Sequence, residues 1–332
     1  MKIPILNFDV ESAVLCVSGD DKALELFEWL LGPRRISEQM NLRRNVNIKF
    51  QKARAAANTT LDFIEEKTTQ KGVIIQLYRT PDRVLVVTTG DQLQLDLFAD
   101  GSSIISGAML SDAHQQSQTE LALMALNHAI TAVGQAFVHA ACLAMPDASS
   151  AILLHAKSGT GKTTTSFALT HEGYKIIGDD AAVIQCEKGA GIATAWGIPR
   201  APKVHRNTVN DLPFLKKHSV SEKFNNDGEQ FLDRQKLMEA NIIIDMPLTE
   251  IAAIISLSRN MLAGPSIIKV GPFEGLHDLL EDNLSNAGSL LMPNDSQKLD
   301  IYSAMIRCTP CYRVNLNGSP LEMAHMIAAQ FA

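Results

Sequence analysis

The sequence predicts an α/β protein in two parts, a small N-terminal α+β domain at residues 1–110 and a larger α/β domain at residues 111–332. Three observations predict this. The chain has 332 residues, which is more than one domain usually needs. Short apolar runs separated by turn residues fill the stretch 72–109. A strand, a glycine-rich loop, a helix and a second strand follow one another between residues 151 and 180.

The bulk composition is that of a globular protein with a mild negative charge. The chain is 46% apolar and 20% charged, and its formal net charge is −6. Without a long basic run, no nucleic-acid partner is expected. No apolar run reaches the roughly 18–20 residues that cross a bilayer, so no membrane association is expected. The first residues carry acids early and lack a long apolar core, which is not the pattern of a secretory signal, and we expect a cytoplasmic protein.

The N-terminal domain is predicted from one helix and a series of strands. Apolar residues at helical spacing between Asp21 and Leu31 predict a helix with one apolar face. Four apolar runs follow, and turn sequences between them predict an antiparallel meander: GVIIQLY, RVLVVTT, LQLDLF and SIISGAM. We find no catalytic constellation in this domain, and the sequence leaves its role open.

The larger domain is predicted to begin with a helix that ends near Gly134. Its expected strands are AFVHAACLAM, AILLHA, YKIIG, the hairpin AAVIQC and GIATAW, LTEIAAIISLSR and CYRVNL. Two or three helices are expected between about residues 272 and 308, and PLEMAHMIAAQFA predicts a final helix.

The cysteines suggest reduced thiols, because five of them occur in a chain without a secretory signal. Cys308 and Cys311 have the spacing of a redox or metal motif, but no second such pair accompanies them. We interpret them as the end of a helix, a proline turn and the start of a strand. Whether they have a function stays open.

The glycine-rich loop carries the strongest chemical signal. The sequence SGTGKT follows an apolar strand and precedes a helical pattern, so several backbone N–H groups and a helix N-terminus can face one anion. Lys162 is expected on the outer phosphates of a nucleotide, and the Thr163 hydroxyl on Mg²⁺. The first glycine of the G-x-x-x-x-G-K-[ST] pattern is replaced by alanine. The expected nucleotide contacts are Ala156, Ser158, Gly159, Thr160, Gly161, Lys162, Thr163 and Thr164. The alternative is an ordinary glycine-rich turn with a solvated lysine.

Two adjacent aspartates, Asp179 and Asp180, end the apolar run that follows the predicted helix. They come soon after Lys162, so we expect the loop and the carboxylates at the ends of neighbouring strands. Of two such carboxylates, one suits a metal ion and the other can accept a proton from an attacking hydroxyl. The alternative is a plain turn, which glycine and aspartate favour.

These motifs together resemble a known family. The stretch FVHAACLAM…AILLHAKSGTGKTTTSFALTHEGYKIIGDDAAVIQ, within residues 136–206, resembles the catalytic core of the HPr kinase/phosphorylase family. It is also similar in plan to the nucleotide site of phosphoenolpyruvate carboxykinases. The resemblance implies an HPr-kinase/PEP-carboxykinase-like P-loop fold for the larger domain.

The resemblance also implies roles for single residues. Lys162 matches the phosphate-binding lysine, Thr163 the Mg²⁺ ligand, Asp179 the catalytic base, Asp180 its metal-side neighbour and His139 the histidine beside the site. Arg200, in WGIPRAPKVH, is a cation that can stabilise charge on a transferred phosphoryl group. That stretch offers no acid where the family has one, which leaves a second metal contact, phosphorolysis and HPr itself as the target open.

The expected function is ATP- and Mg²⁺-dependent transfer of the γ-phosphoryl group to an acceptor hydroxyl. The resemblance implies a serine of a protein or peptide. A small hydroxylated molecule is the alternative acceptor, and a nucleotide-binding regulatory protein with little transfer activity is the alternative function. A carboxykinase or pyrophosphate-using reaction is a third possibility, and a homo-oligomer is a possible assembly.

Overall fold

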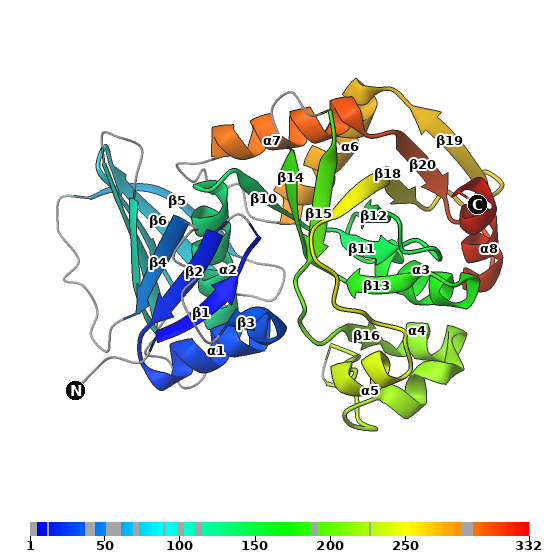
Figure 1. Cartoon of the computed structure of the whole chain (residues 1–332), viewed down its shortest axis with the longest axis horizontal. Coiled ribbons are helices and arrows are strands. Elements are labelled where there is room, and N and C mark those ends of the chain that lie inside the picture. The colour runs from blue at the N-terminus through cyan, green and yellow to red at the C-terminus, as the bar shows by residue number, and fades with distance from the viewer. Residues whose placement is uncertain are drawn as a thin grey trace. The chain divides into compact units, whose positions relative to one another are not determined.

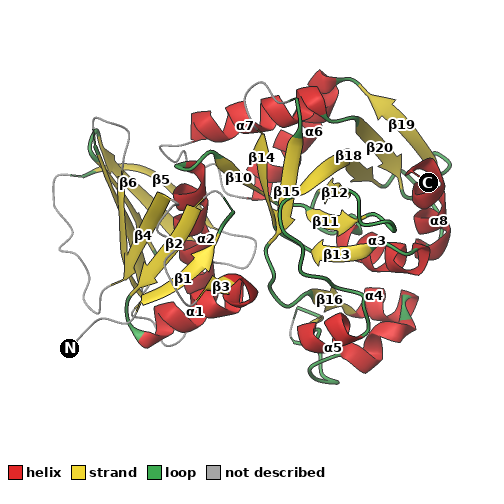
Figure 2. Ribbon diagram, viewed as in Figure 1, coloured by secondary structure: helices red, strands yellow, loops and turns green. Residues whose placement is uncertain are grey.

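The computed structural model describes residues 5–11, 13–36, 44–50, 61–68, 73–88, 91–98, 103–109, 115–186, 191–225, 227–286 and 295–331. The chain divides into two compact units (Figures 1 and 2). The first is Met1–Gly134 with Ala287–Lys298, and the second is Gln135–Asn286 with Leu299–Ala332. The domain boundary between residues 110 and 111 stays a prediction.

The first unit is built on one mixed sheet with strand order β3-β1-β2-β4-β9-β8-β7-β6-β5. The expected meander is confirmed, because β6 to β9 pair antiparallel in sequence order. The sheet extends further than expected, since β4 pairs in parallel with both β2 and β9. The strands are β1 Ile5–Asp9, β2 Ala13–Ser18, β3 Arg35–Ile36, β4 Arg44–Phe50, β5 Asp62–Thr68, β6 Ile74–Thr80, β7 Arg83–Val87, β8 Asp91–Leu97 and β9 Ser103–Met109.

Two helices belong to this unit. α1 Asp21–Leu31 has the predicted bounds and is capped by Asp20, whose carboxylate accepts a hydrogen bond from the Ala23 amide at 3.0 Å. α2 Gln115–Thr131 lies within the helix that the sequence predicts before Gly134. A short 3₁₀ turn, Gly32–Arg34, follows α1.

The second unit has a sheet of order β10-β14-β15-β18-β12-β11-β13, with β20 beside β18 and β19 beside β20. β12, β18 and β20 run parallel to one another. The strands of the unit are β10 Gln135–Val138, β11 Ala141–Ala144, β12 Ala151–Ala156, β13 Lys175–Gly178, β14 Ala182–Cys186, β15 Ala193–Gly197, β16 Lys203–His205, β17 Glu229–Phe231, β18 Thr249–Ser258, β19 Ser266–Val270 and β20 Cys311–Asn315.

Helices cover both faces of this sheet, which explains why its central strands are apolar throughout. Alternate residues of β12 enter different cores: Ile152 and Leu154 pack with α3 Lys162–Leu169 and α8 Pro320–Phe331, whereas Leu153 packs with α6 Pro272–Asn286 and α7 Asp295–Cys308. A small group of elements, α4 Arg206–Asp211, α5 Arg234–Glu239 and the β16–β17 pair, lies beside β13 and α3 (Figure 1). The mixed arrangement of helices and large sheets agrees with the predicted α/β class.

Two expectations about the strands are corrected. AFVHAACLAM is not one strand: it breaks at His139 and Ala140, and β10 pairs with β14 whereas β11 pairs with β12 and β13. β12 and β13 are therefore not neighbours, because β11 lies between them. Since β11 is antiparallel to both, β12 and β13 still run in the same direction and end at the same edge of the sheet.

Other elements follow the prediction. The hairpin strands are β14 and β15, and the helices expected after residue 272 are α6 and α7. Helix α7 ends at Cys308 and β20 begins at Cys311, which confirms the interpretation of that pair as a helix end followed by a strand. Within the described residues, no helix is both long enough and apolar enough to span a membrane.

The helix behind the glycine loop should depend on one buried aromatic side chain. Phe167 of α3 is fully buried in the core between α3, α8 and the sheet. We predict that Phe167→Ala lowers the free energy of unfolding by about 3–5 kcal/mol, because it removes a large side chain from a packed core. Urea denaturation followed by the fluorescence of Trp196, in a Trp29→Phe background, reports on the second unit.

The matched control is Leu321→Ala on α8, where the side chain is 45% exposed. It should cost less than about 1 kcal/mol. Equal losses for the two variants would contradict the assignment of Phe167 to the core.

Candidate functional site

The glycine loop, residues 157–161, connects the buried strand β12 to helix α3. Gly159 has φ of 80° and Gly161 has φ of 122°, values that side-chain-bearing residues rarely adopt. The Thr160 amide donates to the Lys157 carbonyl at 3.1 Å, which closes the turn, and Lys162 begins the helix. The loop therefore presents backbone amides and a helix N-terminus at the edge where β12 ends.

Lys162 is a buried cation at this edge, with a residue exposure of 8%. Its ammonium nitrogen lies 2.6 Å from Asp180 Oδ1 and 3.3 Å from His139 Nε2. An ammonium group can only donate, so His139 Nε2 is the acceptor and the ring proton is on Nδ1. That Nδ1 lies 3.0 Å from the Asp180 carbonyl oxygen and donates to it.

Asp180 joins the cationic groups of the site. Besides Lys162, its carboxylate forms an ion pair with Arg200, and His139 Nδ1 lies 3.3 Å from Oδ1. Burial acts to raise the pKa of Asp180, but the charges of Lys162 and Arg200, with the hydrogen bond from Lys162, outweigh it and hold that pKa well below its ordinary value. Asp180 is therefore ionised throughout the physiological range.

Asp179 has a different environment from its neighbour. It is 7% exposed, and its Oδ2 accepts a hydrogen bond from the Thr163 hydroxyl at 3.2 Å. Its Oδ1 is buried and has no hydrogen-bond partner among the described residues. Burial, together with the adjacent charge of Asp180, raises the pKa of Asp179 to about 7. Their surroundings thus give the two carboxyl groups very different pKa values.

His139 is held neutral. Burial lowers the pKa of His139, the nearby charges of Lys162 and Arg200 lower it further, and Asp180 opposes them. The main-chain break between β10 and β11 places this residue at the edge of the sheet, beside Lys162.

Helix α6 supports the site with three consecutive side chains that the sequence does not signal. Asn283 Oδ1 accepts from the His139 amide at 2.7 Å, and the buried Asp282 lies 2.6 Å from His155 Nδ1 on β12. The carboxylate of Glu281 forms an ion pair with Lys157 of the glycine loop. These contacts link α6 to the end of β10, to β12 and to the loop.

A close approach of two backbones positions the aspartates. A Cβ on Gly197 of β15 would lie 2.4 Å from the Gly178 nitrogen, and one on Gly178 would lie 2.8 Å from the Gly197 Cα. Only glycine fits at either position. Because Asp179 and Asp180 directly follow Gly178, this contact determines where both carboxylates emerge from β13.

The structure brings the predicted residues Lys162, Thr163, Asp179, Asp180, His139 and Arg200 together. Ala156 is buried at the end of β12, and Ser158 is exposed in the loop. The Thr164 hydroxyl is 2.7 Å from the Thr208 hydroxyl of α4. Sequence reasoning missed Glu281, Asp282 and Asn283, since an acidic stretch on an amphipathic helix reads as a solvated face.

The donor atoms beside Thr163 fit Mg²⁺. Magnesium takes oxygen ligands, and it is usually bound by one or two carboxylates together with phosphate oxygens and water. The Thr163 hydroxyl and the carboxylates of Asp180 and Asp179 supply such oxygens, and Asp179 Oδ1 has no hydrogen-bond partner among the described residues. No cluster of three or more His, Cys, Asp and Glu side chains suited to a metal occurs among the described residues.

The cysteine motif does not contribute to this cluster. Cys308 Sγ lies 3.9 Å from Cys186 Sγ, a residue of β14, whereas Cys311 is buried and its thiol hydrogen-bonds the Thr309 carbonyl at 3.5 Å.

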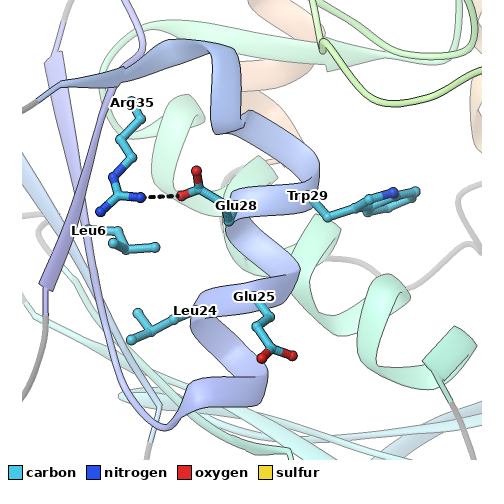
Figure 3. A pocket seen from close by; sticks show the side chains of 6 residues that line it. All are labelled: Leu6, Leu24, Glu25, Glu28, Trp29 and Arg35. Atoms are coloured by element: carbon cyan, nitrogen blue, oxygen red, sulfur yellow. Dashed lines mark hydrogen bonds and ion pairs between the residues drawn. The ribbon is translucent and has the colours of Figure 1, made fainter. Parts of the chain in front are cut away.

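A shallow pocket in the first unit contains none of the predicted site residues. It lies against α1 and is lined by Leu6, Leu24, Glu25, Glu28, Trp29 and Arg35 (Figure 3). Arg35 and Glu28 form an ion pair at 3.2 Å across it.

In the comparisons with known proteins, the similarity lies in solved structures, and it is distant. No protein-family model matches the sequence, and no curated protein matches it. The structure is similar to that of the Hpr(Ser) kinase/phosphatase from Coxiella burnetii with a TM-score of 0.31 and 12% identity, over 59% of this chain and 95% of that one. A TM-score this low supports no conclusion about activity, and the resemblance to that family stays a prediction.

The raised pKa of Asp179 predicts how the stability of the protein depends on pH. The folded protein binds the Asp179 proton more tightly than the unfolded chain does, because its pKa rises from 3.8 to about 7 on folding. The stabilisation that this proton provides is present below about pH 4 and is lost as the pH rises through about 7. We predict that Asp179→Asn becomes more stable relative to wild type between pH 5 and pH 8, as measured by urea denaturation.

The control is Asp147→Asn, in an exposed turn where hydrogen bonds from Ser149 lower the pKa of Asp147. That carboxyl titrates below this window, so its variant should show a pH-independent difference. The same result for Asp179→Asn would contradict the raised pKa.

The ion pairs of Asp180 predict how this residue affects the binding of anions. In the ligand-free protein, this carboxylate occupies the cations that an incoming anion would use. We predict that Asp180→Asn binds inorganic tripolyphosphate about tenfold more tightly in the presence of EDTA, since a charged hydrogen bond no longer has to be broken. Isothermal titration calorimetry measures this, with Asp147→Asn as the variant that changes charge elsewhere. Unchanged or weaker affinity would show that Asp180 does not compete with anions.

Proposed function

We propose that this protein is a kinase that transfers the γ-phosphoryl group of ATP to an acceptor hydroxyl. One observation carries the proposal: at the start of the helix after a glycine loop, a buried lysine and an arginine pair with one of two adjacent aspartates, and a threonine hydroxyl donates to the other. The pKa of the first aspartate is lowered and that of the second is raised. A glycine loop alone indicates only anion binding. The carboxylate pair adds the acid–base and metal-binding groups that phosphoryl transfer requires.

In this proposal, the nucleotide phosphates lie on residues 156–164. Amides of the glycine loop and the N-terminus of α3 hydrogen-bond phosphate oxygens, and Lys162 neutralises the outer phosphates. Arg200 stabilises charge on the transferred group. Thr163 and Asp180 hold Mg²⁺, which supplies further neutralisation of phosphate charge when bound. Most of the catalysis then comes from positioning and electrostatics.

Asp179 is the proposed base that orients and deprotonates the acceptor hydroxyl. Its hydrogen bond with Thr163 also suits a metal ligand, which would exchange the roles of the two aspartates. The acidities favour the first assignment. A base works best with a pKa near the working pH, and burial raises that of Asp179 to about 7, whereas cations hold that of Asp180 far below it.

The proposed acceptor is a serine of a protein or peptide, as the sequence resemblance implies, with a small hydroxylated molecule as the alternative. A nucleotide-binding regulatory protein with little transfer is the second candidate. Two observations favour it: Ala156 in place of the first loop glycine, and the absence of an acid between Ala193 and His205.

Incubation of purified protein with γ-labelled ATP and Mg²⁺, with and without a cell lysate, tests the proposal. Wild type should label a lysate protein or metabolite. Lys162→Ala should bind ATP at least about tenfold more weakly, because a buried charged contact is removed. Asp179→Asn should bind ATP normally and lose about 10²- to 10⁴-fold in transfer rate, the usual contribution of a general base.

Asp147→Asn serves as a control for the loss of a carboxylate and should behave as wild type. Nucleotide binding without label on any acceptor would favour the regulatory protein. Transfer by Asp179→Asn at the wild-type rate, together with loss of transfer in Asp180→Asn, would exchange the two aspartate roles.

A further inference from the structure

The glycine loop has a second flank, on the side of β18. In the sheet, β12 lies between β18 on one side and β11 and β13 on the other. The aspartates come from the β13 side. On the other side, β18 runs parallel to β12 and ends at Ser258, so the residues after it emerge at the edge that holds the glycine loop.

Arg259 is the first of these residues, and it lies beside the loop. A Cβ added to Gly161 would lie 3.5 Å from a terminal guanidinium nitrogen of Arg259 and 3.5 Å from Leu316 Cδ1. The Arg259 side chain is exposed, and no ion pair or hydrogen bond of its side chain occurs among the described residues. A cation next to the residue that precedes Lys162 is thus available to a ligand.

Hydrogen bonds from the Asn315 side chain fix the main chain that follows Arg259. Asn315, at the end of β20 and 8% exposed, accepts from the Asn260 amide at 2.6 Å. Its side-chain nitrogen donates to the carbonyls of Asn260, Ala263 and Gly264 at 2.9–3.1 Å. A buried amide that makes four hydrogen bonds to one short loop holds that loop in a single arrangement. The position of Arg259 relative to Gly161 is therefore prepared in advance of binding.

We infer that Arg259 binds the α- and β-phosphates of the nucleotide and stabilises the charge that develops on departing ADP. The inference rests on the proposed function for the identity of the nucleotide. The base and Arg200 lie on the β13 side, which assigns the acceptor and the transferred group to that flank. The part of the nucleotide that leaves then belongs on the opposite flank, where Arg259 stands. An arginine suits this role because its planar donors pair with two phosphate oxygens.

Calorimetric titration of the full-length protein with ATP, ADP and inorganic tripolyphosphate tests this. We predict that Arg259→Ala weakens all three by about tenfold or more, and that Arg259→Lys recovers part of the loss, since a point charge replaces a bidentate one. In transfer assays, Arg259→Ala should also lower kcat. Thermal unfolding should be unchanged, because the side chain is exposed.

Lys269→Ala is the matched control. Lys269 is an exposed cation on β19 that pairs with Tyr312, near the start of β20 and far from the edge that holds Asn315. Its loss should leave all three affinities unchanged. ADP affinity of Arg259→Ala within twofold of wild type would overturn the inference. A loss seen with ATP and not with tripolyphosphate would also overturn it, since the contact would then be to adenosine.

The result separates this inference from the proposed function. If wild type transfers no phosphoryl group but Arg259→Ala weakens tripolyphosphate and ADP, the kinase proposal fails and Arg259 remains a phosphate-binding residue. If wild type transfers the phosphoryl group and Arg259→Ala binds the three ligands as wild type does, the kinase proposal stands and the role of Arg259 is wrong. If wild type binds none of the three ligands, both are wrong.

Discussion

The ion pair between Lys162 and Asp180 is the interaction on which the candidate site depends. A lysine this deeply buried is stable as a cation only with a partner, and Asp180 supplies it at 2.6 Å. The same carboxylate holds Arg200 and His139, so one negative charge organises three groups that come from α3, from the loop after β15 and from the break between β10 and β11. Its charge also raises the pKa of Asp179 and thereby gives the two aspartates different chemistry.

This arrangement is possible because the backbone brings distant segments to one edge. The break at His139 lets the chain leave β10 and start β11 between β12 and β13. The contact between Gly178 and Gly197 then brings β13 and β15 close enough for Arg200 to reach Asp180. On the far side of β12, Asn315 fixes the loop that carries Arg259. Each of these three constraints fixes the main chain beside one side chain of the site: His139, Arg200 or Arg259.

The sequence predicts the parts of this site that are local and not those that depend on distant contacts. The glycine loop, Lys162, Thr163 and the aspartate pair lie within one strand–helix–strand unit, so their spacing implies their meeting. The break of AFVHAACLAM was not predictable, because both halves are apolar and only pairing with different strands separates them. Asn283 and Asn315 act across 144 and 55 positions of chain, and isolated asparagines carry no signal in a sequence. The meander of the first unit was predictable from turn chemistry, whereas the parallel pairs of β4 were not.

The charges of the site explain why a metal should accompany the proposed substrate. Without a ligand, Lys162 and Arg200 share the ionised carboxylate of Asp180, and the raised pKa of Asp179, about 7, keeps a large fraction of its carboxyl group protonated at neutral pH. A triphosphate that takes over the two cations leaves Asp180 as a partly buried anion beside further anions, which is costly unless a new cation joins it. A divalent metal that arrived with the nucleotide would supply that cation. Its charge would also lower the pKa of Asp179, so that the carboxyl group loses its proton when the substrate is in place. In the proposed function, the loss of the Asp180 ion pairs on nucleotide binding would thus link nucleotide binding, metal binding and deprotonation of the base.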